Sequence, residues 1–202
     1  MLILLSPAKK QTPHLPPLSM NVSLPQFIAQ SDQLMDTLKT FTPETIGQLM
    51  NVSPSLAKLN HQRFQSYSRE QLEQHGTPCL STFQGDAYQS LDVSTLSESA
   101  LIFANQHLFI LSGLYGLLRP FDAILPYRLE MKTRLQIDRI PNLYAFWTQQ
   151  LTTALIQHTS KQPTPLVIDL ASQEYGKATA DTPALHRVRV KFLEQKSVQL
   201  KS

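Results

Sequence analysis

The sequence predicts a single domain of the α/β (α+β) class, with a mixed sheet and a largely helical N-terminal part. The chain has 202 residues, which is long enough to bury one large core. Hydrophobic residues make up 42%, yet no apolar run reaches the roughly 18 residues that a membrane span needs. Short apolar runs alternate with amphipathic stretches, as strands and helices do in this class. We therefore expect no membrane association.

The first strand is expected within residues 1–7, which read MLILLSP. This apolar run is too short for a secretory signal, and no basic residue precedes it. The only cysteine is Cys79, so an internal disulfide framework is excluded. A reducing, cytoplasmic location is the simplest expectation. An extended, proline-rich surface loop is predicted to follow over residues 11–25.

Three helices are predicted before residue 66. Thr42 and Ser53 are each followed by proline, which is the pattern of an N-cap with proline at the first helical position. A longer helix precedes them, with apolar residues close to helical spacing. The predicted helices span 24–38, 42–50 and 53–65.

The rest of the chain alternates between short strands and helices. A stripe that includes Phe146, Trp147 and Leu151 makes the helix over 142–158 the clearest one. Thr95 and Glu98 fit a capping box for an earlier helix. The other predicted elements are a strand over 79–83, a helix from Thr95 to about 105, strands over 108–111 and 166–170, a short helix through Tyr175, and a hairpin formed by 187–193 and 197–200.

Near the end of the chain, cations alternate with valines. Arg187, Arg189 and Lys191 lie on one face of the predicted strand, and Val188 and Val190 on the other. Two interpretations are open at this point. The cations form either a solvated outer face or a strip that faces an anion.

The pair of helices around residue 51, over about 42–66, has the form of a helix-hairpin-helix module. Asn51 and Ser53 stand where such modules usually have glycines. The turn and the start of the second helix present backbone N–H groups that can hold a phosphate of double-stranded DNA without reading its sequence. Lys58 and Arg63 can add positive charge. The alternative is an ordinary helical pair packed on the sheet.

Residues 111–131 combine glycine, proline, tyrosine and both charge signs. Arg119 and Arg128 suit bidentate recognition of phosphate or carboxylate. Asp122 and Glu130 can orient these arginines, or one of them can act as a general base. The alternative is a buried ion-pair network that holds the loop. Tyr127 belongs to the same candidate site.

Polar side chains also follow other predicted strands, where α/β proteins place their working groups. Ser6 and Lys9 follow the first strand, Asp86 follows the strand over 79–83, and Ser172 follows the strand over 166–170. Asp86 can cap a helix or orient an arginine. The six histidines lack the paired spacing of zinc sites, and no glycine-rich cofactor motif occurs, so neither a metal nor a cofactor is predicted.

Taken together and in this order, these motifs resemble the YaaA family of bacterial peroxide stress proteins. The match includes the run from Ser112 to Gly116 (SGLYG) and the run from Pro126 to Met131 (PYRLEM). The resemblance covers essentially the whole chain, as one domain over 1–202. The matching segments are 4–9, 49–64, 83–88, 106–135, 143–147 and 170–175.

The resemblance implies a cytoplasmic protein of the hydrogen peroxide response that limits damage linked to free intracellular iron. It implies DNA binding, a helix-hairpin-helix element and a positively charged cleft. The residues expected to line the cleft are Lys9, Arg119, Tyr127, Arg128, Arg134 and Ser172. An enzyme of unknown reaction on a nucleotide or nucleobase is the alternative, and its candidate acids or bases are Asp86, Asp122 and Glu130.

The chain departs from the family pattern at several positions. Lys132 stands where the family usually has glycine. Asp169 replaces an asparagine and adds a negative charge near the expected cleft. The chain ends at Ser202, so it is expected to lack the family's C-terminal segment.

Overall fold

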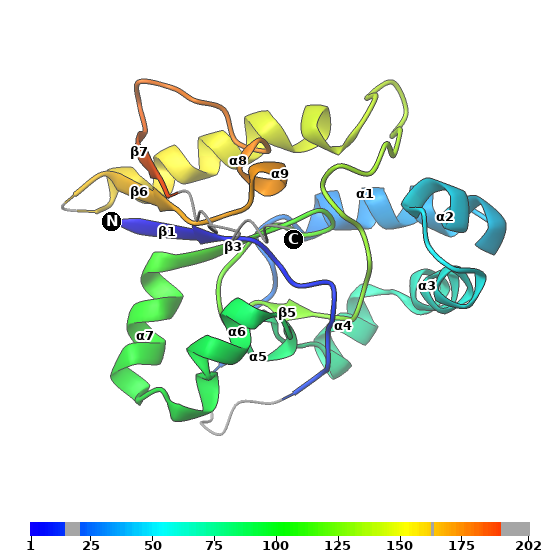
Figure 1. Cartoon of the computed structure of the whole chain (residues 1–202), viewed down its shortest axis with the longest axis horizontal. Coiled ribbons are helices and arrows are strands. Elements are labelled where there is room, and N and C mark those ends of the chain that lie inside the picture. The colour runs from blue at the N-terminus through cyan, green and yellow to red at the C-terminus, as the bar shows by residue number, and fades with distance from the viewer. Residues whose placement is uncertain (15–20, 163, 191–202) are drawn as a thin grey trace, which may run out of the picture.

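A mixed five-stranded sheet forms the centre of the fold (Figure 1). The computed structural model describes residues 1–14, 21–162 and 164–190, and the strands counted here lie within them. The strand order is β4-β3-β1-β6-β7. Strands β3, β1, β6 and β7 are parallel, and β4 is antiparallel to β3. The bounds are Leu2–Leu5 (β1), Leu108–Ser112 (β3), Gly116–Leu118 (β4), Leu166–Asp169 (β6) and His186–Arg189 (β7). The predicted α/β class is confirmed.

Strand β1 lies in the middle of the sheet because both of its edges are paired. Ile3 is in register with Leu108 of β3 on one side and with Ile168 of β6 on the other. Leu2 and Leu4 are fully buried. Helix α8 (Leu143–Ser160) covers one face of the sheet, and α7 (Glu98–His107) lies against the other (Figure 1).

Trp147 anchors α8 to the turn between β3 and β4. Its side chain is completely buried, and its indole N–H donates to the carbonyl oxygen of Gly113 at 2.9 Å. Gly116, the first residue of β4 after that turn, has a φ of 72°. A Cβ there would lie 2.7 Å from the Trp147 ring, so this position requires glycine.

The predicted N-terminal helices are present. Thr42 and Ser53 cap α2 and α3 as expected, by accepting from the backbone N–H groups of Thr45 and Leu56. The α2–α3 pair forms the end of the molecule farthest from α7 and β6 in Figure 1. The bounds are Ile28–Lys39 (α1), Pro43–Met50 (α2), Pro54–Ser66 (α3) and Arg69–His75 (α4).

The strand predicted over 79–83 is wrong. Cys79–Thr82 forms one helical turn, α5, in which the hydroxyls of Ser81 and Thr82 both donate to the carbonyl oxygen of Pro78. All four residues are buried. A short run that is buried on every side carries no periodicity with which to separate a strand from a helix. A two-stranded sheet flanks this turn, formed by β2 (Thr77–Pro78) and β5 (Ala123–Ile124).

The helix predicted from Thr95 begins three residues later. Ser97 caps α7 by accepting from the N–H of Ala100, and Thr95 ends a 3-10 turn, η1 (Val93–Thr95). The Thr95–Glu98 capping box is therefore wrong. Serine is as good an N-cap as threonine, and Ser97 lies closer to the apolar stretch.

Strand β7 lies in the first arm of the predicted C-terminal hairpin. β7 pairs with β6 in parallel and takes the edge of the main sheet. The second arm, 197–200, and Lys191 lie outside the described residues. None of the helices in the described part of the chain is both long and apolar enough to cross a membrane. Two short helices complete the structure, α6 (Asp86–Leu91) and α9 (Gln173–Gly176).

Candidate functional site

A cleft opens where the parallel strands β1 and β6 end. From β1 the chain reaches β3 on one side and later β6 on the other, so the strand order reverses around β1. In open α/β sheets, ligands bind outside the carboxyl ends of the strands at such a switch point. Two adjoining hollows of about 770 and 270 Å³ lie there, and we call them together the switch-point cleft. The lining residues that both hollows share are Ser6, Pro7, Ala8, Lys9 and Ser172.

Two serines join the loops after β1 and β6. The Ser6 hydroxyl oxygen accepts from the backbone N–H of Ser172 at 2.8 Å and lies 3.2 Å from the Ser172 hydroxyl. The Tyr88 hydroxyl donates to the Ser6 carbonyl oxygen at 2.6 Å. These bonds fix the floor of the cleft and leave polar oxygens along it.

Glu130 is the centre of the charges in the cleft. Its Oε1 lies 2.9 Å from Arg128 Nη2 and 3.2 Å from Lys9 Nζ, and its Oε2 lies 3.3 Å from Lys132 Nζ. Lys132 also pairs with Glu174 at 3.5 Å. Burial raises the pKa of Glu130, but hydrogen bonds and charges from these cations outweigh it, and the pKa lies below its ordinary value. Glu130 is therefore an ionised partner of cations and a weak base.

Arg128 and Tyr127 form the wall beside Glu130. Arg128 Nε is buried and has no hydrogen-bond partner within the described part of the chain. The Tyr127 hydroxyl lies 2.6 Å from the Ser112 hydroxyl, and its backbone N–H donates to Gln11 Oε1 at 2.8 Å. Burial raises the pKa of Tyr127 well above the usual range. Tyr127 thus positions the wall, and Arg128 is the group with an unused donor.

Asp86 lines the larger hollow, apart from the Glu130 cluster. It is the first residue of α6, whose N-cap is Gly85 with no side-chain cap. The interpretation of Asp86 as a helix cap is therefore wrong. Its exposed carboxylate lies at the rim of the cleft.

Arg119 and Asp122 form a separate cluster. The Asp122 carboxylate is completely buried and accepts from the Arg119 backbone N–H at 2.8 Å, Arg119 Nη2 at 3.1 Å and the Ser23 hydroxyl at 2.7 Å. Burial raises the pKa of Asp122 against these contacts. Neither residue lines the switch-point cleft, and nor does the exposed Arg134. For this pair the geometry matches the alternative of a network that holds a loop.

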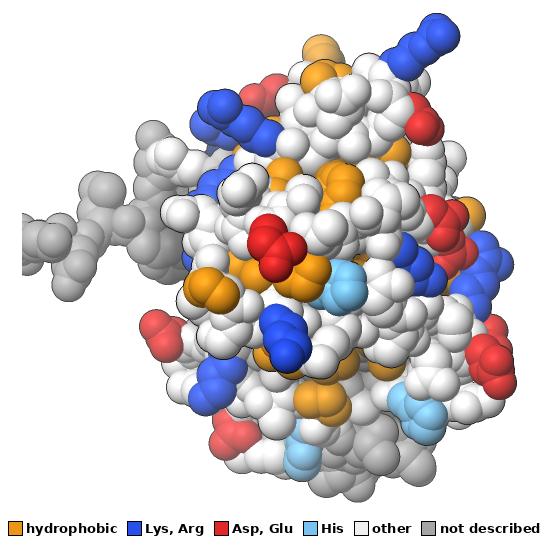
Figure 2. Space-filling view, turned by 90° about the vertical axis from the view of Figure 1, so that its right-hand side faces the viewer, with side chains coloured by type: hydrophobic (Ala, Val, Ile, Leu, Met, Phe, Trp, Pro, Cys, Tyr) orange, Lys and Arg blue, Asp and Glu red, His pale blue; other side chains and the backbone are white. Residues whose placement is uncertain are grey.

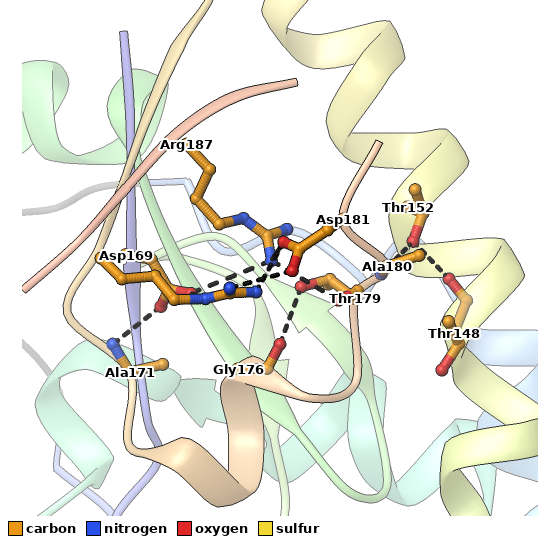
Figure 3. A network of polar contacts seen from close by, with 10 residues as sticks. Thr148, Thr152, Asp169, Ala171, Gly176, Thr179, Ala180, Asp181 and Arg187 are labelled. Atoms are coloured by element: carbon orange, nitrogen blue, oxygen red, sulfur yellow. Dashed lines mark hydrogen bonds and ion pairs between the residues drawn. The ribbon is translucent and has the colours of Figure 1, made fainter. Parts of the chain in front are cut away.

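The cations on β7 face the protein's own carboxylates (Figure 3). Asp169 is 2% exposed and lies in register with Arg189. Arg187 Nη1 lies 3.6 Å from Asp181 and 4.0 Å from Asp169, and Arg189 pairs with Asp181 at 2.7 Å. Val188 is 51% exposed instead. The two arginines of this strand thus face anions, as one of the two interpretations expected, but these anions are Asp169 and Asp181 of the same chain.

The α2–α3 turn lies away from the cleft. Asn51 adopts the left-handed conformation with φ 50° and ψ 59°, which glycine would adopt more freely. Ser53 and Lys58 are exposed, whereas Arg63 is partly buried, and this desolvation lowers its pKa. Lys58 and Arg63 are five positions apart, about 140° around the helix, so they lie on different faces. Only Lys58 shares the exposed side of α3 with Ser55 and Gln62.

Charges of both signs are interspersed on the end of the molecule that carries α2 and α3 (Figure 2). No large basic patch gathers in that view. Any phosphate contact at this end would therefore have to rely on the turn and on single cations.

The structure offers little support for a reactive thiol or for a metal site. Burial raises the pKa of the Cys79 thiol well above its usual value. Among the described residues, no group of three or more His, Cys, Asp or Glu side chains is placed to hold a metal ion.

The sequence did not predict that Gln11 lines the cleft or that Lys132 joins the Glu130 cluster. Gln11 was expected only as part of a surface loop, and Lys132 only as a departure from a family pattern. The spacing Arg128, Glu130, Lys132 is the signal that could have found Lys132, because alternate residues of an extended segment point to the same side.

Comparison with known proteins gives a consistent result. The family model described as "Peroxide stress protein YaaA" matches residues 1–202. A UPF0246 protein of Shewanella pealeana is 47% identical over 178 residues, and one of Polynucleobacter necessarius is 42% identical over 177 residues. A UPF0246 protein of Polaromonas is 44% identical over 178 residues. Each alignment covers 88% of this chain and 69% of the relative.

Proposed function

This chain belongs to the YaaA family of peroxide stress proteins, and we propose that it acts in that response by binding double-stranded DNA through backbone phosphates. The α2–α3 turn makes the main contact in this proposal. The supporting observation is the exposed start of α3, where Ser53 caps the helix directly after the left-handed Asn51.

The physical basis is the free polar end of a helix. The first N–H groups of an α-helix have no acceptor within the helix, and the helix dipole places partial positive charge there. In α3, Pro54 has no N–H and the Leu56 N–H donates to the Ser53 hydroxyl oxygen, so the Ser55 N–H is the donor that we assign to the phosphate. Residues 53–55 are exposed, so a phosphate can approach this end from solvent. Such a contact holds any duplex, since phosphates carry no sequence information.

Lys58 adds the only full charge that we assign to the contact. It follows Ser53 by five residues, about 7.5 Å along the helix axis and about 140° around it, so its long side chain has to extend back toward the helix start to reach the phosphate. Arg63 is partly buried on another face and is not expected to reach the same strand. Few phosphates are neutralised, so we expect weak binding with a shallow salt dependence, a slope of about −1 to −2.

Duplex binding measured by fluorescence anisotropy between about 50 and 200 mM salt tests this proposal. Lys58→Gln should weaken binding several-fold at the lowest salt and reduce the salt slope by about 1. The matched control is Lys161→Gln, which removes the same charge at the end of α8 and should leave both quantities unchanged. Folded wild-type protein with no affinity for duplex at the lowest salt would refute the proposal.

A second candidate function is an enzyme that acts on a nucleotide or nucleobase. The observation that favours it is the placement of Lys9, Arg128, Ser172 and Asp86 in one cleft at a switch point. Asp86 is then the candidate acid or base, because Glu130 is ion-paired and Asp122 lies elsewhere. Turnover of a nucleotide panel that is lost in Asp86→Asn would support it, and no turnover of any member would remove it.

The wider role that we propose is the limitation of damage linked to free intracellular iron, in the cytoplasm. It rests on the family resemblance and on the DNA contact proposed above. Cells that lack the protein should accumulate more DNA breaks under hydrogen peroxide. Wild-type protein should reverse this, and Lys58→Gln should reverse it less well.

A further inference from the structure

We propose that the switch-point cleft binds a phosphate-class oxyanion. When the ligand is absent, the Glu130 carboxylate pairs with the cations that would bind it and so acts as an internal competitor. This inference goes beyond the DNA contact of the α2–α3 pair and does not depend on it. The ligand is the phosphate group of a small molecule or of a nucleic acid end.

The first step rests on how the cations are arranged. Lys9, Arg128 and Lys132 all lie within 3.3 Å of one carboxylate, whose side chain is 14% exposed. Three cations around a single planar anion resemble the surroundings of a bound phosphate, which offers three or four oxygens. Glu130 supplies two oxygens, and one of them is shared by Lys9 and Arg128.

The second step rests on Arg128. A guanidinium binds oxyanions best through two parallel N–H groups on one edge. Glu130 uses only Nη2, and Nε stays buried without a partner in the described part of the chain. A buried donor left unsatisfied is costly. A bidentate oxyanion on the Nε–Nη2 edge would remove that penalty. Glu130 leaves it in place, because its carboxylate contacts Nη2 alone.

The third step is the balance of charge. Without Glu130, Lys9 and Arg128 lose the carboxylate that they share, and Lys132 keeps Glu174 as a partner, so this cluster of four side chains carries a net charge of +2. A phosphate dianion would neutralise this charge. The side chains of Lys9 and Lys132 are both 63% exposed, so they can follow an incoming anion without opening the core.

The fourth step is the position of the cluster in the fold. The smaller hollow that holds Arg128 and Glu130 is also lined by Ser6 and Ser172, at the ends of β1 and β6. The Ser172 hydroxyl accepts from the Ser6 hydroxyl and keeps its own proton, which it can donate to a phosphate oxygen that Arg128 does not reach. The cluster thus lies where the fold class binds its ligands.

Calorimetric titration with inorganic phosphate and with pyrophosphate, at constant ionic strength, tests the inference. Glu130→Gln should bind phosphate about tenfold more tightly than wild type, because the competitor is gone and the cations remain. The matched control is Glu73→Gln, which makes the same change of net charge on the exposed surface of α4 and should leave the affinity unchanged. Arg128→Lys should weaken binding about tenfold, since it keeps the charge and loses the two-donor edge.

An unchanged or weaker affinity in Glu130→Gln would overturn the inference, because Glu130 would then be a residue that positions the cations. A measurement on wild-type protein guards against a variant that fails to fold. The Arg128 Nε–H resonance should shift as phosphate is added, and a resonance that stays unchanged at saturation would also overturn the proposal. Neither result depends on duplex affinity, which Lys58→Gln tests separately.

Two further ligands separate the sources of the phosphate. Tighter binding of a nucleoside monophosphate than of inorganic phosphate, with the same dependence on Glu130, assigns the cleft to a small molecule. Tighter binding of a duplex with 5′-phosphates than of one without, again dependent on Glu130, assigns it to a DNA end. No binding of any of these probes by either wild type or Glu130→Gln would overturn the inference.

Discussion

The α2–α3 pair and the switch-point cleft are built in opposite ways. The pair takes all its residues from 42–66, and each helix starts at its own cap. The cleft gathers side chains from the ends of β1 and β6, from α6 and from the segment around Arg128. In the pair Lys58 is exposed to solvent, whereas in the cleft the cations are held by Glu130.

This difference teaches how each region responds to change. A substitution in the pair acts on one turn of helix, so its effect on stability is confined to local terms. In the cleft, segments from several parts of the chain contact one another. A substitution in one of them is therefore expected to displace the others as well. Glycine substitutions test the contrast most directly, because one glycine, Gly113, lies against the backbone that leads to Glu130, and another, Gly47 of α2, lies against α3.

Gly113→Ala should have the largest effect, a loss of about 3 kcal/mol in the free energy of unfolding, at the upper end of what overpacking costs. A Cβ at this position would overlap the carbonyl oxygen of Leu129, in the backbone that leads into Glu130. Backbone cannot move aside as a side chain can, so the wall with Arg128 should shift. Denaturant unfolding measures the loss, and phosphate titration should show weakened binding. Unchanged stability would show that this wall is adaptable and would break the contrast.

The sequence predicts the pair well because its signals are local. Thr42 and Ser53 each precede proline, and both cap as expected. The strands β1, β3 and β6 are also found where apolar runs predict them. The helical turn Cys79–Thr82 was missed because it is buried on every side.

The cleft is predictable only in part, since its members meet through the topology of the sheet. Lys9, Tyr127, Arg128 and Ser172 were expected at one site and do line one cleft. Arg119 has the same chemistry and lies in the same loop region, yet it pairs with the buried Asp122 instead. Residue type alone cannot distinguish the roles of these two arginines, because the role of each depends on the carboxylate that the fold places beside it.

Ser53→Ala should reduce the free energy of unfolding by about 1 kcal/mol, as is usual for the loss of an N-cap. The Leu56 N–H, which now donates to the Ser53 hydroxyl oxygen at 3.4 Å, would lose its acceptor. Chemical denaturation measures the loss. Phosphate affinity of the cleft should not change, and a change there would show that the two regions are coupled.

Gly47→Ala should be slightly stabilising, by about 0.5 to 1 kcal/mol, the gain from replacing glycine within a helix. A Cβ at this position would lie 3.5 Å from the Ala57 Cβ, an ordinary contact between α2 and α3. The same glycine-to-alanine change thus has opposite signs in the two regions. Thermal unfolding compares them, and a destabilised Gly47→Ala would mean that the helices of the pair cannot accommodate one methyl group.

The smallest effect concerns pH and separates the exposed ion pairs of the cleft from the buried cluster at Asp122. The pKa of Glu130 lies below its unfolded value of 4.5, since the neighbouring cations outweigh its burial. Its contribution to stability is therefore complete above pH 4.5 and is lost as the pH falls through the folded pKa. The difference in melting temperature between wild type and Glu130→Gln should shrink over that interval.

Burial raises the pKa of Asp122 above 3.8, so the difference in melting temperature between wild type and Asp122→Asn should follow the opposite trend as the pH falls. If both melting-temperature differences moved in the same direction as the pH falls, burial would dominate the pKa of Glu130 as it does that of Asp122. An oxyanion could then not readily replace the Glu130 carboxylate.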